Sequence, residues 1–128
     1  MATFVYWTGI YNLLLAGAVF FPALLRMLGI RMPDSVLWTE IIAWIVAFLG
    51  VMLILCSRNL KARASIVYWG GWLRIAAAVE LCWFGFLRSH GAMLGMLGLI
   101  DAAIGIVYLA GLTRMLGASH ADLALDRV

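Results

Sequence analysis

Four long apolar runs constrain this chain more than any other feature of its sequence. They cover about residues 4–28, 36–56, 64–87 and 92–115, and an α-helix needs ~20 mostly apolar residues to cross a bilayer. In lipid the backbone must satisfy its own hydrogen bonds, so the runs are expected to form helices. Apolar residues make up 66% of the chain and charged residues 12%, which excludes a soluble enzyme domain, a disordered chain and a secreted disulfide-rich domain.

The links between the runs are short, which predicts that helices adjacent in sequence pack antiparallel. We therefore expect an all-α fold, a four-helix transmembrane up-down bundle formed by residues 1–116. Pro22 lies inside the first run and should kink or shorten its outer end. Residues 117–128 are expected to be a short cytoplasmic tail that is frayed rather than folded. We expect no repeat between the two halves of the chain.

The basic residues indicate which side of the membrane each link faces. The link at residues 57–63 carries Arg58, Lys61 and Arg63 without an acid, and cytoplasmic loops are enriched in such residues. With Arg114 and Arg127, five basic residues fall on this side, against three on the other: Arg26, Arg31 and Arg88. Both termini are therefore predicted to be cytoplasmic, in a multi-pass membrane protein.

Ionisable residues inside the spans are the main functional signal, because each costs ~2.5–3.5 kcal/mol at mid-bilayer. Arg74 falls near the middle of the third span, and Glu80 and Asp101 fall at similar depths on the third and fourth. We expect Arg74 to pair with Asp101 and Glu80 to be partly protonated near neutral pH. The predicted buried polar cluster has six members: Asn12, Glu40, Arg74, Glu80, Asp101 and Tyr108.

This cluster has two interpretations, a structural ion pair that fixes helix packing and a site for a ligand, a proton or a substrate. Glu40 has an alternative of its own, a half-solvated acid near a helix start that the helix dipole favours. The GxxxG spacing of Gly91 and Gly95 predicts a close helix contact, either within the bundle or between two copies.

The sequence gives no sign of a metal site or a cofactor. Cys56 and Cys82 lie in different apolar runs and form no CxxC pair. His90 and His120 lie outside the runs and have no partner at the spacing of a metal or haem site. The two cysteines are expected to be buried small apolar residues.

Three features together resemble a known group: the run GVMLILCSRN at residues 50–59, the run WGGWLR at 69–74, and Asp101 followed by Gly105 and Tyr108. They are similar to small bacterial four-helix membrane proteins of the DoxX-like group. The resemblance covers about residues 40–115 and implies the four-helix fold and a bacterial inner membrane. It implies no assigned activity, so Arg74 and Asp101 are family-like positions without a catalytic role.

The function expected first is that of an accessory subunit, or of a protein that binds an apolar small molecule around the polar cluster. The first alternative is a proton-coupled transporter working as an oligomer, with Glu80 and Asp101 exchanging the proton; the lack of an inverted repeat argues against it. The second is a membrane-embedded isomerase with Arg74 as electrophile, although no nucleophile is evident and an enzyme is the less favoured reading. The expected partners are lipid, an apolar small molecule and further copies or a larger membrane complex, but no nucleic acid.

Overall fold

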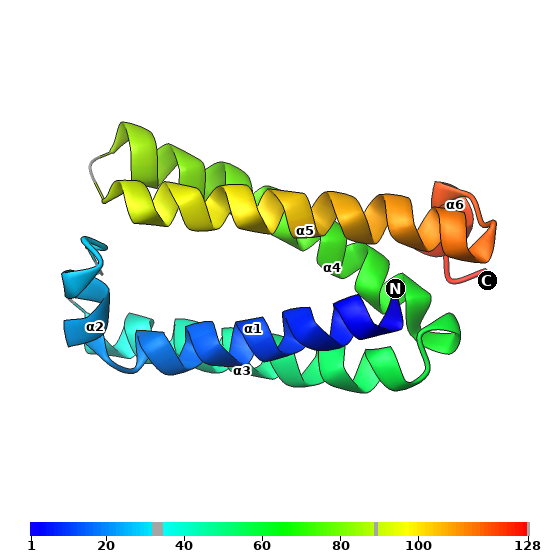
Figure 1. Ribbon diagram of the computed structural model, residues 1–128, viewed down its shortest axis with the longest axis horizontal. Coiled ribbons are helices and arrows are strands. Elements are labelled where there is room, and N and C mark those ends of the chain that lie inside the picture. Colours follow the sequence, from blue (N-terminus) through cyan, green and yellow to red (C-terminus); the bar gives the residue numbers. More distant parts are fainter. Residues whose placement is uncertain (32–34, 89, 128) are drawn as a thin grey trace.

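The computed structural model describes residues 1–31, 35–88 and 90–127, and all regular structure in these ranges is helical (Figure 1). Four helical segments are long and apolar enough to cross a membrane, as predicted. In chain order the elements are α1 (Ala2–Val19), α2 (Pro22–Met27), α3 (Val36–Arg58), the 3-10 turn η1 (Lys61–Arg63), α4 (Ala64–Cys82), the π-helical turn η2 (Trp83–Leu87), α5 (Ala92–Leu116) and α6 (His120–Ala124). Both termini lie at one end of the molecule, the N/C end, and α2 lies at the other, the α2 end (Figure 1).

The first apolar run does not form one continuous span. α1 ends at Val19, and Pro22 begins the separate short helix α2. Proline has no N–H for the helical hydrogen bond, and its ring clashes with the preceding turn. The expected span of residues 4–28 is therefore too long, and the expected shortening at Pro22 is confirmed. The 18 residues of α1 extend about 27 Å, close to the ~30 Å thickness of a hydrocarbon core.

The four long helices pair as two antiparallel hairpins, α1 with α3 and α4 with α5 (Figure 1). α3 and α4 follow each other in sequence but make few contacts, and the hairpins diverge towards the α2 end. The contacts between the two halves are therefore few, which the sequence did not predict. At the α2 end the backbone N–H of Arg31 donates to the carbonyl of His90 at 3.0 Å, so a loop contact also joins the two hairpins there.

A close crossing of two glycines holds each hairpin together. A Cβ added to Gly9 would lie 2.8 Å from the carbonyl oxygen of Gly50, and one added to Gly50 would lie 2.8 Å from that of Gly9. Gly71 and Gly105 meet in the same reciprocal way in the second hairpin, at 3.2 and 2.8 Å. Hydrophobic burial gives helices little reason to associate in lipid, so close backbone approach of this kind is what pairs them.

The two crossings are equivalent residue by residue. A Cβ on Gly9 would also meet Ile54, which lies four residues after Gly50. A Cβ on Gly71 would also meet Leu109, which lies four residues after Gly105. The hairpins therefore repeat one packing arrangement, in the same direction along the chain.

This register reveals a repeat of local packing around the glycine contacts. It aligns YWTGIYN at residues 6–12 with YWGGWLR at residues 68–74, so Asn12 and Arg74 occupy equivalent positions. The shared letters are few and the two stretches are 62 positions apart, because 71 minus 9 is 62. They are visible only once the glycine contacts set the alignment.

The GxxxG pair serves contacts within the chain. Gly95 of α5 packs against the ring of Phe86 and the backbone of Gly85, both in η2. Gly91 has a φ of 111°, a conformation that side chains other than hydrogen rarely adopt, and it lies against the carbonyl of Gly29. The interpretation of a contact within one bundle is therefore the one that the structure supports.

The most buried apolar side chains gather at the N/C end, where both hairpins contribute to one core. Val5 and Leu53 come from the first hairpin, and Val67 and Leu112 come from the second. Leu123 of α6 joins this core and is fully buried. The hairpins are thus packed together by apolar contacts at the N/C end and diverge towards the α2 end.

The tail is folded, which corrects the expectation of a frayed segment. The Ser119 side chain accepts from the backbone N–H of Asp122, and the Asp122 carboxylate accepts from Ser119 in return, a capping box that starts α6. The Ser65 hydroxyl donates to Asp126 at 2.7 Å, and the Trp69 indole N–H donates to the carbonyl of Ala124 at 3.2 Å. These bonds fix α6 against the start of α4.

Acid is expected to loosen the start of α6. The hydroxyl and backbone N–H of Ser119 donate to the Asp122 carboxylate and lower its pKa below the usual range. The stabilisation is therefore present above the ordinary aspartate pKa and is lost as the pH falls through the lowered folded value. The Asp122 carboxyl titration, followed by NMR in detergent, checks this. In Ser119→Ala the midpoint should move up towards the ordinary value, and an unchanged midpoint would contradict the capping box.

Candidate functional site

Arg74 lies at the centre of the site and connects three helices. Its Nη1 donates to Oδ1 of Asp101 on α5, and its Nη2 donates to Oδ1 of Asn12 on α1 at 2.7 Å. Its guanidinium carbon lies 5.8 Å from the centre of the Tyr108 ring, within the range of a cation–π contact. The residue is only 8% exposed. The predicted pairing of Arg74 with Asp101 is therefore present, and it is the one ion pair found within the described ranges.

Tyr108 forms a second polar link between the hairpins. Its hydroxyl is hydrogen-bonded to Oγ1 of Thr8 on α1. The Thr8 hydroxyl donates to the carbonyl of Val5 at 2.9 Å, so Tyr108 is the donor in the shared bond. Both Thr8 and Tyr108 are buried. We refer to Thr8, Asn12, Arg74, Asp101 and Tyr108 together as the polar centre.

The polar centre joins the equivalent faces of the two repeats. Asn12 and Arg74 hold matching positions in their hairpins, and they bond directly to each other. Asp101 precedes its crossing glycine by four residues, and the matching position in the first hairpin is Val46. One hairpin thus supplies the charged pair, and the other supplies only a neutral amide and a hydroxyl. A buried charge must be paired and hydrogen-bonded. The second hairpin meets this need within itself, because the Asp101 carboxylate neutralises the Arg74 guanidinium.

Tyr11 is a neighbour of this site that the sequence analysis missed. Its hydroxyl is buried and has no hydrogen-bond partner among the residues that the structure describes. Its neighbour in the chain, Asn12, is part of the polar centre. Its position in the sequence could have identified it. Tyrosine in a spanning helix favours the membrane interface, whereas Tyr11 falls in the middle of α1.

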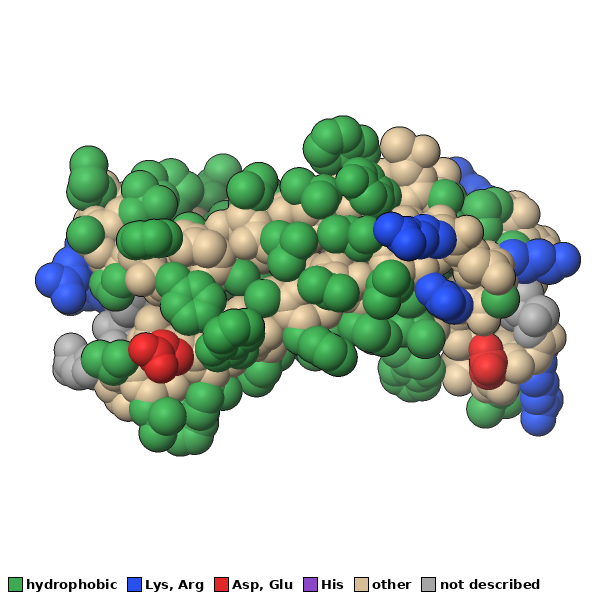
Figure 2. Space-filling view, turned by 90° about the horizontal axis from the view of Figure 1, so that it is seen from below, with side chains coloured by type: hydrophobic (Ala, Val, Ile, Leu, Met, Phe, Trp, Pro, Cys, Tyr) green, Lys and Arg blue, Asp and Glu red, His purple; other side chains and the backbone are tan. Residues whose placement is uncertain are grey.

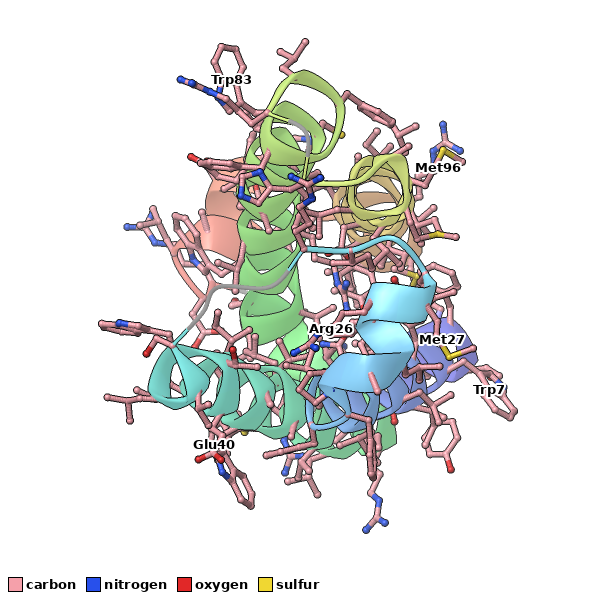
Figure 3. The ribbon with its side chains drawn as sticks, turned by 90° about the vertical axis from the view of Figure 1, so that its left-hand side faces the viewer. Trp7, Arg26, Met27, Glu40, Trp83 and Met96 are labelled. Carbon is pink, nitrogen blue, oxygen red and sulfur yellow. The ribbon has the colours of Figure 1, made fainter. Side chains whose placement is uncertain are left out.

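The two glutamates of the predicted cluster lie apart from the polar centre. Glu40 is exposed on the outer side of α3 and points away from the other helices (Figure 3). Ile42, two residues later, faces the inside of the bundle. Two residues correspond to a rotation of about 200° on an α-helix, so Glu40 faces the opposite way and does not belong to the cluster. Glu80 is exposed too, but it lies on the inner side of α4 and makes no ion pair or hydrogen bond within the described part of the chain.

A cavity of about 410 Å³ lies between the hairpins. All four long helices line it, with the largest share from α3 and α4, the sequence neighbours that make few contacts. Its polar lining consists of Asn12, Arg74, Glu80, Asp101 and Tyr108, and the remaining lining is apolar or glycine. Five of the six predicted cluster residues therefore share one cavity, although only four of them touch one another.

The cavity is built from matching positions of the two repeats. Asn12 faces it with Arg74, and Val46 of α3 faces it with Asp101 of α5. Leu53 and Tyr108, each three residues after its crossing glycine, form a further matching pair. The cavity therefore lies at the interface between the repeats.

The outer surface is typical of a protein surrounded by lipid. Figure 2 shows apolar side chains over the middle of one face, with Lys and Arg towards its ends. Trp7, Met27, Trp83 and Met96 point outward, whereas Arg26 of α2 is directed towards the space between the hairpins (Figure 3). Many large apolar side chains are exposed along α3, including Trp44 at 68% and Phe48 at 66%. A soluble protein rarely exposes contiguous apolar surface of this extent.

Comparison with known protein families, with curated proteins and with solved structures finds no match to this chain. No group of three or more His, Cys, Asp or Glu side chains that could hold a metal ion is present in the described ranges. The four apolar helices and the ion pair between them define the class: an all-helical, multi-pass membrane protein with a cavity between two repeated hairpins.

Proposed function

We propose that this protein binds an apolar small molecule in the cavity between its hairpins. The observation that carries the proposal is the cavity itself, whose volume of about 410 Å³ lies within the ~300–1,000 Å³ of small-molecule sites. Its lining is mainly apolar with a few convergent polar groups, the usual composition of such sites. The guest would come from the bilayer through the open side between α3 and α4.

The polar centre would form a fixed wall of this site. Both terminal nitrogens of Arg74 already have acceptors, and the Tyr108 hydroxyl already donates to Thr8. The charge of Arg74 is therefore already neutralised by Asp101, and the main contribution of these groups is to hold the hairpins at a set separation. The apolar positions along α3 and α4 would provide most of the contact with the guest.

The location and orientation are part of the same proposal. Arg58, Lys61, Arg63, Arg114 and Arg127 lie at the N/C end, and Arg26, Arg31 and Arg88 lie towards the α2 end. Under the positive-inside rule this bias would place both termini in the cytoplasm. The proposed membrane is the bacterial inner membrane, as the similarity to the DoxX-like group implies.

A bulky side chain inside the cavity is expected to displace the guest. Ala77 lines the cavity, whereas Ala76 beside it is exposed and does not. Ala77→Phe should weaken one-to-one binding of the neutral apolar probe diphenylhexatriene by at least about tenfold, because the ring fills the space that the probe needs. Saturable energy transfer from tryptophan to the probe, in nanodiscs of zwitterionic lipid, measures the affinity, and native mass spectrometry gives the stoichiometry.

Ala76→Phe is the matched control, since it adds the same ring to the same helix on the outer side. Its affinity for the probe should equal that of the unmodified protein. Absence of saturable binding to the unmodified protein, or equal loss in both variants, would refute the proposed cavity function. Apolar molecules that remain bound to the protein after purification can be identified in the same mass spectra.

A proton-coupled transporter is the second candidate, and the repeat favours it. Some transporters consist of parallel repeats related by an axis along the membrane normal, with the substrate site at the repeat interface. The cavity here lies between two such repeats. Uptake of a substrate into proteoliposomes that requires an imposed pH gradient would support transport. Binding of the substrate without uptake would support the binding function alone. The accessory-subunit and isomerase hypotheses stay predictions.

A further inference from the structure

Glu80 is the charged group of the cavity that has no partner among the residues that the structure describes. The other two charges of the lining, Arg74 and Asp101, neutralise each other through their direct ion pair. No Lys or Arg among the described residues lies within ion-pair distance of the Glu80 carboxylate. With Arg74 and both carboxylates ionised, the lining carries a net charge of −1, which is the sum of +1, −1 and −1.

The depth of Glu80 makes this unpaired state unfavourable for the protein alone. It lies seven positions before Leu87, the end of η2, a distance of about 10 Å along the helix. An ionisable residue at such a depth usually faces a cavity or a partner and marks a binding site. Arg26 is directed towards the space between the hairpins but makes no ion pair with Glu80 (Figure 3).

We infer that the guest of the cavity is an amphiphilic cation, an amine or quaternary ammonium on an apolar body, whose positive group pairs with Glu80. The inference rests on the proposed function, because it specifies the polar end of the same guest. The apolar walls on α3 and α4 hold the body of the molecule, and the carboxylate neutralises its charge. An anionic guest is disfavoured, because the formal charge of the lining is −1 when both carboxylates are ionised and the charge of Arg74 is neutralised by Asp101.

Three probes with the same apolar body and different charges test this inference. They are diphenylhexatriene, its trimethylammonium derivative and its propionate derivative, measured in nanodiscs of zwitterionic lipid. The unmodified protein should bind the cationic probe about tenfold more tightly than the neutral one, and the anionic probe more weakly, because a unit charge a few ångströms from a carboxylate is worth at least this factor at a partly hydrated site. In Glu80→Gln the cationic preference should disappear while the affinity for the neutral probe stays the same.

Glu40→Gln is the matched control, because it removes the same charge from the outside of α3 and should leave all three affinities unchanged. A flat charge series in the unmodified protein overturns the inference, as does a cationic preference that survives in Glu80→Gln. Either result leaves the proposed function intact provided the neutral probe binds. Failure of the neutral probe to bind the unmodified protein refutes the proposed function instead. The charge series of the unmodified protein decides the inference even where Glu80→Gln binds no probe.

Discussion

Arg74→Met is expected to lower the free energy of unfolding by about 3–5 kcal/mol, the usual cost of removing one partner of a buried ion pair. The change would leave the Asp101 carboxylate without its cation and Asn12 without its donor. Both losses fall on bonds that connect α4 to other helices. Reversible unfolding in detergent, by temperature or by added denaturing detergent, measures the effect.

The double variant Arg74→Met with Asp101→Leu separates the charge from the packing. Replacing both members of a buried pair with apolar side chains is often neutral in stability, so most of the lost free energy should return. Arg114→Met is the control, because Arg114 is exposed in the last turn of α5 and makes no ion pair within the described ranges. A double variant as unstable as Arg74→Met would show that the side chains act through packing rather than through uncompensated charge.

Gly9→Ala is expected to destabilise the protein by about 1–3 kcal/mol, the usual cost of forcing an extra carbon into a tight contact. The new methyl group would lie 2.8 Å from the carbonyl oxygen of Gly50, and this backbone atom cannot move without shifting α3. Unfolding in detergent, as for Arg74→Met, gives the magnitude.

Gly17→Ala in the same helix is the matched control. No atom lies within 4 Å of a Cβ added there, so this change should be neutral or stabilising by up to about 1 kcal/mol, because alanine is the better helix former. Gly105→Ala should reproduce the loss in the second hairpin, where the added carbon would lie 2.8 Å from the carbonyl of Gly71. If Gly9→Ala and Gly17→Ala change the free energy of unfolding equally, the glycine crossing does not determine how the two helices of a hairpin pair.

The sequence predicts the helices well because the length and hydropathy of each run depend on local composition alone. Pro22 also acts locally, and it ends the first span as expected. The choice of which helix faces align is different. In lipid an apolar side chain loses little by facing the bilayer instead of another helix, so the apolar pattern could not reveal that α3 and α4 separate or that a cavity lies between them.

The polar residues were predictable to the extent that depth and charge constrained them. A buried guanidinium requires a carboxylate at its own depth, which identified Asp101 as the partner of Arg74. Depth does not specify helical phase, so it could not decide between the cluster and a half-solvated position near the helix start for Glu40, which is exposed on the outer side of α3. Tyr11 and the bond from Tyr108 to Thr8 depend on how the hairpins face each other, and nothing in a single sequence defines that arrangement.

The repeated glycine crossing has a consequence for how this molecule can move. Each hairpin has its own backbone contact, and the hairpins meet through the apolar core at the N/C end, the polar centre and the loop contact of Arg31 with His90. We therefore expect any change in the width of the cavity to take the form of a rigid-body rotation of one hairpin about that core. The resistance to such a rotation comes from a few hydrogen bonds between side chains and loops, and the helix pairs themselves need not repack.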